Sequence, residues 1–271
     1  MKYRSWVPSL ISVLLVVSFL PAQTAPLSSN TRLAAILRLP ALQPGDWDAL
    51  FSMAESGDPE AQYWLGRIFD AGTLLPLDKE KSAYWYRKSA EQGYASAEYW
   101  VCRDRANQDS LELERCMWRA AEKGVPEAQL WLGVAFDQHR FGVTNEQEAI
   151  RWFRKAAEQG NSDAEDTLGV HYEVGEGVDQ DYVKAAYWFR RAAEHVPDLG
   201  GAGQGRNNLG ILYADGDGVP KDSVQAYMWF SLAGNNDNIG YTQREMTPDQ
   251  ISRAQELAAD WKLQHPDPAI Y

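Results

Sequence analysis

The sequence predicts an all-α fold, a right-handed α/α solenoid of about five helical-hairpin repeats with a capping helix at each end. Three observations support this prediction. A helix-forming decapeptide occurs five times, a second helix-forming block follows each copy, and glycines separate the blocks. The copies align on a Leu-Gly pair or its equivalent, at intervals of 36, 31, 36 and 41 residues, at Leu65, Val101, Leu132, Leu168 and Leu209.

The N-terminal 25 residues have the pattern of an export signal. Lys2 and Arg4 precede an apolar run, residues 7–20, and small residues follow at Ala22 and Ala25. The run is shorter than the roughly 20 residues that cross a bilayer. We expect cleavage at about residues 22–25, a periplasmic or secreted protein, and no membrane span in the mature chain. An uncleaved N-terminal anchor is the alternative.

The elements that follow are predicted in chain order. Residues 26–45 hold three prolines and are predicted to be a linker. Asp46 can cap a short helix, Trp47–Ser56, and Thr247 can cap a final helix from Pro248, with Gln250 at the capping-box position. The predicted solenoid spans 46–263, with repeats at 57–92, 93–123, 124–159, 160–196 and 205–236, a C-terminal cap at 248–263 and a tail at 264–271.

Each repeat is predicted to be a pair of helices joined by a glycine-containing turn. In the first block, Ala61, Leu65 and Phe69 share one face of a helix, which is therefore the core face. The glycine of the Leu-Gly pair is expected to let the second helix approach closely, facing Ala83, Ala149, Ala185 or Ala226. The glycine-rich run 200–205 does not have dinucleotide-loop spacing and is expected to be a flexible junction.

The turns carry a second recurring motif, Gly-x-Gly-Val. It occurs in the fourth and fifth repeats, where Val178 and Val219 are expected to pack the turn into the core. The second repeat lacks this motif, is shorter than the others, and has Cys102 in place of the glycine of the Leu-Gly pair. We therefore expect a tighter hairpin turn in that repeat.

The combined pattern resembles the Sel-one-like repeat family, tetratricopeptide-like α/α solenoids. Its parts are Ala-x-x-x-Leu-Gly-x-x-Tyr, Gly-x-Gly-Val and Ala-x-x-Trp-Phe-Arg-Lys-Ala-Ala-Glu-x-Gly, and the resemblance covers about residues 57–235. It implies that the first helices line a concave face where partners bind. It also implies that Trp85, Trp152, Trp188 and Trp229 are core residues.

A row of side chains beside the core stripe of the first helices is the candidate partner-binding site. Trp and Arg are favoured at binding hot spots, and adjacent aromatic rings suit a linear ligand. The alternative is that the tryptophans pack between neighbouring first helices. The row comprises Trp64, Arg67, Trp100, Arg103, Trp131, Thr167 and Asn208.

Cys102 and Cys116 are the two cysteines of the chain and lie symmetrically about the expected hairpin turn at Asp109. Residues at equal distances from such a turn face each other on antiparallel helices, and an exported chain meets oxidising conditions. We predict a disulfide between them. Two buried free thiols are the alternative.

No catalytic, metal-binding or cofactor-binding motif is present. The four histidines have no zinc spacing, and no nucleophile elbow or phosphate loop occurs. The net charge of −12 makes nucleic-acid binding improbable. The sequence thus predicts an exported, non-catalytic scaffold or regulator that binds a protein or peptide segment in the cell envelope. Recognition of a cell-wall or exopolysaccharide chain is the first alternative, and a β-lactam-binding envelope hydrolase is the second.

Overall fold

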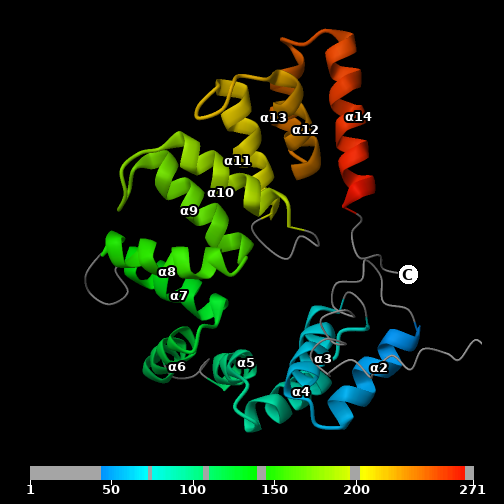
Figure 1. Cartoon of the computed structure of the whole chain (residues 1–271), viewed down its shortest axis with the longest axis vertical. Helices are drawn as coiled ribbons and strands as arrows, with labels where there is room; N and C mark the ends of the chain where they lie inside the picture. Colours follow the sequence, from blue (N-terminus) through cyan, green and yellow to red (C-terminus); the bar gives the residue numbers. More distant parts are fainter. Residues whose placement is uncertain (1–43, 73–74, 106–109, 139–144, 196–201, 266–271) are drawn as a thin grey trace, which may run out of the picture.

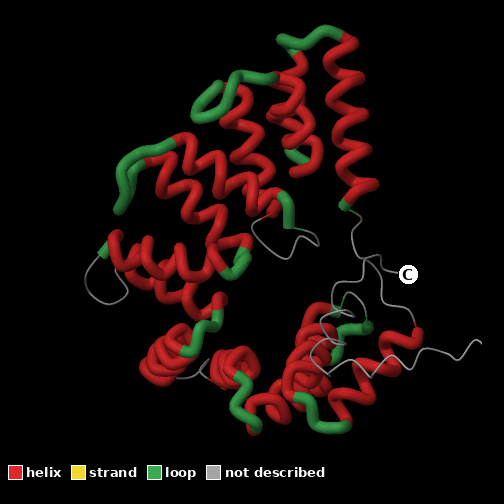
Figure 2. The backbone as a smooth tube through the Cα atoms, viewed as in Figure 1, coloured by secondary structure: helices red, strands yellow, loops and turns green. Residues whose placement is uncertain are grey.

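The computed structural model describes residues 44–72, 75–105, 110–138, 145–195 and 202–265, and within these ranges it is built from helices without strands (Figure 2). The predicted export signal, residues 26–43 of the predicted linker, and residues 266–271 of the tail lie outside the described residues. The all-α solenoid prediction is confirmed. No described helix is long and apolar enough to cross a membrane.

The described helices form five hairpins, with one helix before them and two after them. They are α2 (Pro44–Glu55), α3 (Pro59–Ala71) with α4 (Lys79–Glu91), α5 (Ala95–Arg105) with α6 (Ser110–Glu122), α7 (Pro126–Asp137) with α8 (Glu146–Glu158), α9 (Ser162–Val174) with α10 (Tyr182–Ala193), α11 (Ala202–Asp215) with α12 (Ser223–Ala233), α13 (Asn236–Gln243) and α14 (Pro248–Gln264).

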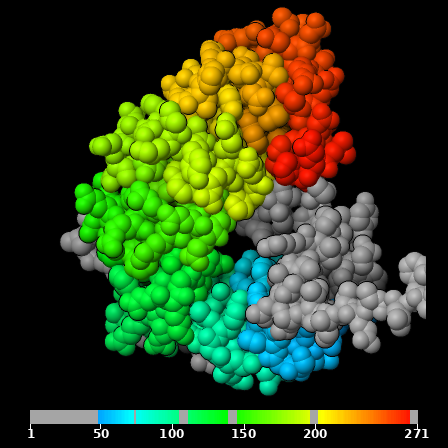
Figure 3. All heavy atoms as spheres, in the orientation of Figure 1, coloured from blue at the N-terminus to red at the C-terminus, as the bar shows by residue number. Residues whose placement is uncertain are grey.

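The hairpins follow one another along a curved arc from α2 to α14 (Figures 1 and 3). First helices of different repeats reach one another across this arc. Asn208 on α11 donates a hydrogen bond to Asp166 on α9 at 2.9 Å, and Arg67 on α3 lies 3.4 Å from Glu127 on α7. Because α5 separates α3 from α7 in sequence, this second contact requires tight curvature. The first helices therefore lie on the inner side of the arc.

Local capping explains where most helices begin. Asp58, Asn161 and Asp181 each accept a hydrogen bond from a backbone N–H in the first turn of the helix that follows. The Thr247–Gln250 capping box is present as predicted. The cap predicted at Asp46 is wrong, because α2 begins at Pro44, a residue that is compatible with a first helical turn.

The glycines of the Leu-Gly pairs do allow close packing, but the predicted alanine partners are wrong. The nearest groups are aromatic rings of the second helices, in the pairs Gly66–Tyr86, Gly133–Phe153, Gly169–Phe189 and Gly210–Phe230. A methyl group at Gly169 would lie 2.5 Å from the Phe189 ring, which is fully buried. The glycine therefore makes room for a core ring.

Two predictions near the C-terminal end are corrected. The run 200–205 is not wholly a flexible junction, because α11 begins at Ala202 and Gly205 lies against Ala192 and Ala193 of α10. A separate short helix, α13, precedes the final cap and was missed. Its sequence, NDNIGYTQ, has a weak apolar pattern. It is held instead by the side chain of Asn235, which accepts from the Asn238 N–H.

The Gly-x-Gly-Val turns pack as predicted. Val178 and Val219 are partly buried against the main core cluster. Gly177 lies against Glu146 at the start of α8, and Gly218 lies against Tyr182 at the start of α10. Both glycines have positive φ values, 71° and 68°, which side-chain-bearing residues rarely adopt. Each turn thus covers the first residue of the second helix in the preceding repeat.

Candidate partner-binding surface

Four of the predicted site residues come together in an arginine–aromatic cluster, which we define as Tyr63, Trp64 and Arg67 on α3 with Trp100 and Arg103 on α5. The guanidinium carbon of Arg67 lies 6.0 Å from the ring centroid of Trp64 and 5.5 Å from that of Trp100. Arg67 also donates a hydrogen bond to the Tyr63 hydroxyl at 3.0 Å. The contacts join the first two repeats through cation–π and polar interactions.

The Trp100 ring is the centre of this cluster. It stacks on Tyr86 of α4, with ring centroids 5.4 Å apart and an interplanar angle of 3°. The guanidinium carbon of Arg103 lies 3.8 Å from the Trp100 ring centroid, and Arg103 is exposed. An exposed cation held on a partly buried ring is a surface suited to binding a polar or aromatic group of a partner.

The electrostatics of the cluster favour neutral tyrosines beside a charged arginine. Burial raises the pKa of Tyr63, although the nearby Arg67 opposes this shift. Burial alone would lower the pKa of Arg67, but Tyr63 and Glu127 outweigh that effect and the pKa is raised. The Tyr63 hydroxyl therefore stays protonated and Arg67 stays charged at neutral pH.

The other three predicted site residues lie outside the cluster. Trp131 is partly buried and, like Trp100, packs against the core cluster that contains Leu132. The Thr167 hydroxyl donates to the carbonyl oxygen of Asp163 on its own helix, and Asn208 donates to Asp166. Both readings of the tryptophan row thus have structural support, because the rings pack between helices and remain partly exposed.

Sequence reasoning missed Tyr63 as a member of the arginine–aromatic cluster, and it missed Tyr86 and Glu127 as residues that contact the cluster. Tyr63 directly precedes Trp64 in the repeated decapeptide, so a second aromatic in the motif was the available signal. Glu127 reaches Arg67 from two repeats away, and the pairing depends on the curvature of the arc. That curvature is not encoded in the spacing of any one motif.

A separate carboxyl group, Asp166 on the inner side of α9, has a perturbed pKa. Burial raises the pKa of Asp166 to about 6, with smaller contributions from the negative charges of Asp163 and Glu173. The hydrogen bond from Asn208 opposes the shift. Since the pKa is higher in the folded protein than in the unfolded chain, this group stabilises the fold at low pH. That contribution is lost as the pH rises through about 6.

We expect Asp166→Asn to stabilise the protein at pH 7 by about 2 kcal/mol and to have almost no effect at pH 4. The amide is uncharged and its oxygen can still accept from Asn208. Urea unfolding at both pH values measures the difference, with Asp179→Asn in the exposed turn after α9 as the control. Equal effects of Asp166→Asn at pH 4 and pH 7 would contradict the assignment.

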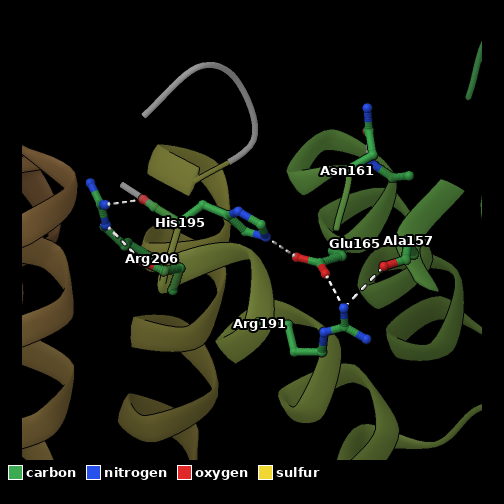
Figure 4. A network of polar contacts seen from close by, with 8 residues as sticks. Ala157, Asn161, Glu165, Arg191, His195 and Arg206 are labelled. Carbon is green, nitrogen blue, oxygen red and sulfur yellow. Dashed lines mark hydrogen bonds and ion pairs between the residues drawn. The ribbon is translucent and has the colours of Figure 1, made fainter. Parts of the chain in front are cut away.

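A buried polar network lies at the base of the fourth repeat (Figure 4). The carboxylate of Glu165 is fully buried and lies 2.7 Å from the Arg191 guanidinium and 2.8 Å from His195 Nε2. Arg191 also donates to the carbonyl oxygen of Ala157 at 3.1 Å. Arg206 binds the carbonyl oxygens of Ala193 and His195, which anchors the fifth repeat on the end of α10.

The corresponding positions in the first and third repeats carry glutamine pairs. Gln92 donates to Gln62 and Gln159 donates to Gln129, each at 2.8 Å. Gln62 and Gln129 then donate to a carbonyl oxygen of the preceding helix, at Ala54 and Ala121. The carboxylate of Glu165 has no N–H to donate to the preceding helix. In the fourth repeat the Arg191 guanidinium donates instead, to the carbonyl oxygen of Ala157. The network is therefore a variant of a structural junction between repeats.

The structure places Cys102 and Cys116 as a disulfide-capable pair on α5 and α6. Their Cα atoms are 6.2 Å apart, within the range that disulfides span. Among the described residues, no group of three or more His, Cys, Asp or Glu side chains is arranged to hold a metal ion.

Comparison with known proteins identifies the repeat. The family model of the Sel1 repeat matches residues 59–94, 126–161, 162–195 and 204–238, just over half of the chain. The second repeat is not matched, in keeping with its cysteine and its short turn. No curated protein matches the sequence significantly.

Several solved structures share the fold. A protective antigen present in uropathogenic Escherichia coli strains, which displays an SLR fold, is 30% identical, with a TM-score of 0.59 over 81% of this chain and 49% of that one. This chain therefore spans about half the length of that antigen. A Sel1 repeat protein from Oxalobacter formigenes is 23% identical, with a TM-score of 0.56 over 86% and 98% of the two chains. An immunity protein from Pseudomonas aeruginosa is 18% identical, with a TM-score of 0.51 over 90% and 87%.

Proposed function

Because the chain belongs to the Sel1 repeat family, we propose that it is a non-catalytic scaffold that holds a segment of a partner protein on the arginine–aromatic cluster. Sel1 repeat proteins are generally protein-interaction scaffolds. The observation that carries the proposal is the exposed Arg103 guanidinium, 3.8 Å from the partly buried Trp100 ring. Arginine and tryptophan together, on the inner side of an arc, are typical of a binding hot spot.

The proposal places this scaffold in the cell envelope. Its support is the sequence of residues 1–25, a positive segment followed by an apolar run and small residues. A cysteine pair at disulfide distance is also typical of exported chains. The function is therefore that of an envelope adaptor or regulator.

Recognition of a glycan is favoured less by the geometry. Sugar rings bind by stacking on an open aromatic face, whereas Tyr86 and Arg103 already lie against the Trp100 ring. Arg67 is likewise engaged with Tyr63 and Glu127. A protein segment, which can contact ring edges and accept hydrogen bonds from arginine, fits this arrangement better.

The test is crosslinked capture of envelope proteins by the wild-type chain and by an Arg67→Ala/Arg103→Ala variant. We expect a specific protein to be retained by the wild type and to be bound at least tenfold more weakly by the variant. The control is Arg151→Ala, which removes an exposed arginine paired with Glu148 on a second helix. Melting of all three proteins is measured in parallel. Equal capture by a folded double variant would rule out this binding surface.

A further inference from the structure

A groove of about 1020 Å³ lies between α4 and the C-terminal part of α5, beside the arginine–aromatic cluster. Its lining includes Lys79, Ala83 and Tyr86 from α4, and Trp100, Arg103 and Asp104 from α5. Three basic and three acidic side chains line it, so the groove has no net charge. The groove therefore does not select its occupant by net charge.

The same place is filled by the chain's own turns in the later repeats. Lys79 is the first residue of α4, directly after its N-cap, as Glu146 is in α8 and Tyr182 in α10. Gly177 lies on Glu146 and Gly218 lies on Tyr182, and a valine follows each glycine into the core. The turn that would cover Lys79 belongs to the second repeat, which lacks Gly-x-Gly-Val.

The connection between α5 and α6 is short, which explains why the start of α4 differs from the start of α8 and of α10. Four residues, 106–109, separate α5 from α6, whereas seven separate α9 from α10 and seven separate α11 from α12. Residues 106–109 themselves lie outside the described part of the chain. The described residues thus leave a groove beside α4 where the later repeats have a packed turn.

Tyr86 is an independent sign that the groove is a binding site. The equivalent residues in the third, fourth and fifth repeats are Phe153, Phe189 and Phe230, each facing the glycine of its Leu-Gly pair. Only 5% of Tyr86 is exposed, and its hydroxyl has no hydrogen-bond partner among the described residues. A buried hydroxyl without a partner is costly and uncommon, so its presence here requires a reason.

We infer that this groove binds a glycine-containing turn of a partner protein, which packs on the start of α4 as Gly177 and Gly218 pack on α8 and α10. The residue after the glycine is a valine or isoleucine that enters the space between α4 and α5. The bound turn moves the side chains that cover the buried Tyr86 hydroxyl, and one of its main-chain groups then hydrogen-bonds that hydroxyl. This inference rests on the proposed scaffold function and specifies the chemistry of the segment that is bound.

The probe is a head-to-tail cyclic peptide of residues 214–222, ADGDGVPKD, which is the chain's own turn from the fifth repeat. A fluorescent label and anisotropy titration with the purified chain measure its affinity. We expect saturable binding. A matched cyclic peptide with Val219→Asp should bind at least tenfold more weakly, because a carboxylate would replace the apolar group that the groove buries.

Two variants of the protein test the groove itself. Tyr86→Phe should weaken peptide binding about five- to tenfold without lowering the melting temperature, since it removes only an unpaired hydroxyl and installs the residue of the later repeats. Ala83→Tyr, the residue found at the equivalent Tyr227, should fill the groove and abolish binding. Tyr84→Phe, an exposed tyrosine on the same helix that does not line the groove, is the matched control.

The outcomes separate the inference from the proposed function. If the wild type does not bind the peptide but captures a partner through Arg67 and Arg103, the inference is overturned and the scaffold function stands. Peptide binding by Tyr86→Phe and Ala83→Tyr that is as tight as binding by the wild type also overturns it. A lower melting temperature for Tyr86→Phe with unchanged affinity would assign Tyr86 a packing role and would equally overturn it. Weaker binding by both variants, with Tyr84→Phe unchanged, supports it.

Discussion

Arg191→Ala is expected to lower the free energy of unfolding by about 3–5 kcal/mol, because it leaves the fully buried carboxylate of Glu165 without its cation. The same change removes the hydrogen bond that Arg191 donates to Ala157 across the repeat junction. His195 would be the remaining contact of that carboxylate within the network of Figure 4. Urea unfolding at pH 7 measures the loss.

A rescue variant distinguishes the loss of charge compensation from loss of packing. In Arg191→Ala/Glu165→Gln/His195→Gln the junction carries the glutamine pair of the third repeat, in which Gln159 donates to Gln129 and Gln129 donates to Ala121. We expect most of the lost stability to return. Lys155→Ala, at the equivalent exposed position of the third repeat, should cost less than about 1 kcal/mol. If the triple variant is as unstable as Arg191→Ala, the charge argument is wrong.

Replacing Cys102 and Cys116 together by alanine is expected to destabilise the oxidised protein by about 3 kcal/mol, the value that the chain-entropy model gives for a closed loop of about 15 residues. The effect should be large for this repeat, because its α5–α6 turn lacks the Gly-x-Gly-Val motif that anchors the later hairpins. Thermal unfolding with and without reductant compares the two proteins. Under reducing conditions the difference should become small.

Intact-mass analysis of protein purified without reductant supplies the direct check on the cysteines. The disulfide predicts a mass two daltons below that of the reduced chain and no reaction with a thiol reagent before reduction. Two reactive thiols in that protein would show that the cysteine pair is reduced and that no disulfide closes the second repeat. In that case the double alanine variant should lose no stability when the reductant is left out.

The fold was predictable because its signals are local and repeated. Helix caps such as Thr247 with Gln250, and the positive-φ glycine in the turn at Gly177, act through neighbouring residues, and the sequence repeats the same core pattern in each hairpin. The observed partners of the Leu-Gly glycines lie one helical turn after the predicted alanines. The α13 helix was missed because its apolar pattern is weak.

The arginine–aromatic cluster was predictable only in part. The recurrence of Trp at one position identified Trp64 and Trp100, and the arginine one turn later identified Arg67 and Arg103. The stacking of Tyr86 on Trp100 joins two repeats, and the pairing of Arg67 with Glu127 spans three. These contacts depend on the angle at which each hairpin packs on the one before it. The sequence of one repeat does not determine that angle.

The most direct test of the proposed binding surface is site-specific photocrosslinking in the living envelope. A photoreactive phenylalanine analogue replaces Asp104, an exposed residue beside Arg103 that lines the groove, or Tyr187, an exposed residue on α10. The account predicts a discrete adduct with one partner protein from position 104 and none from position 187. An adduct from position 187 with none from position 104, in chains that melt like the wild type, would contradict it.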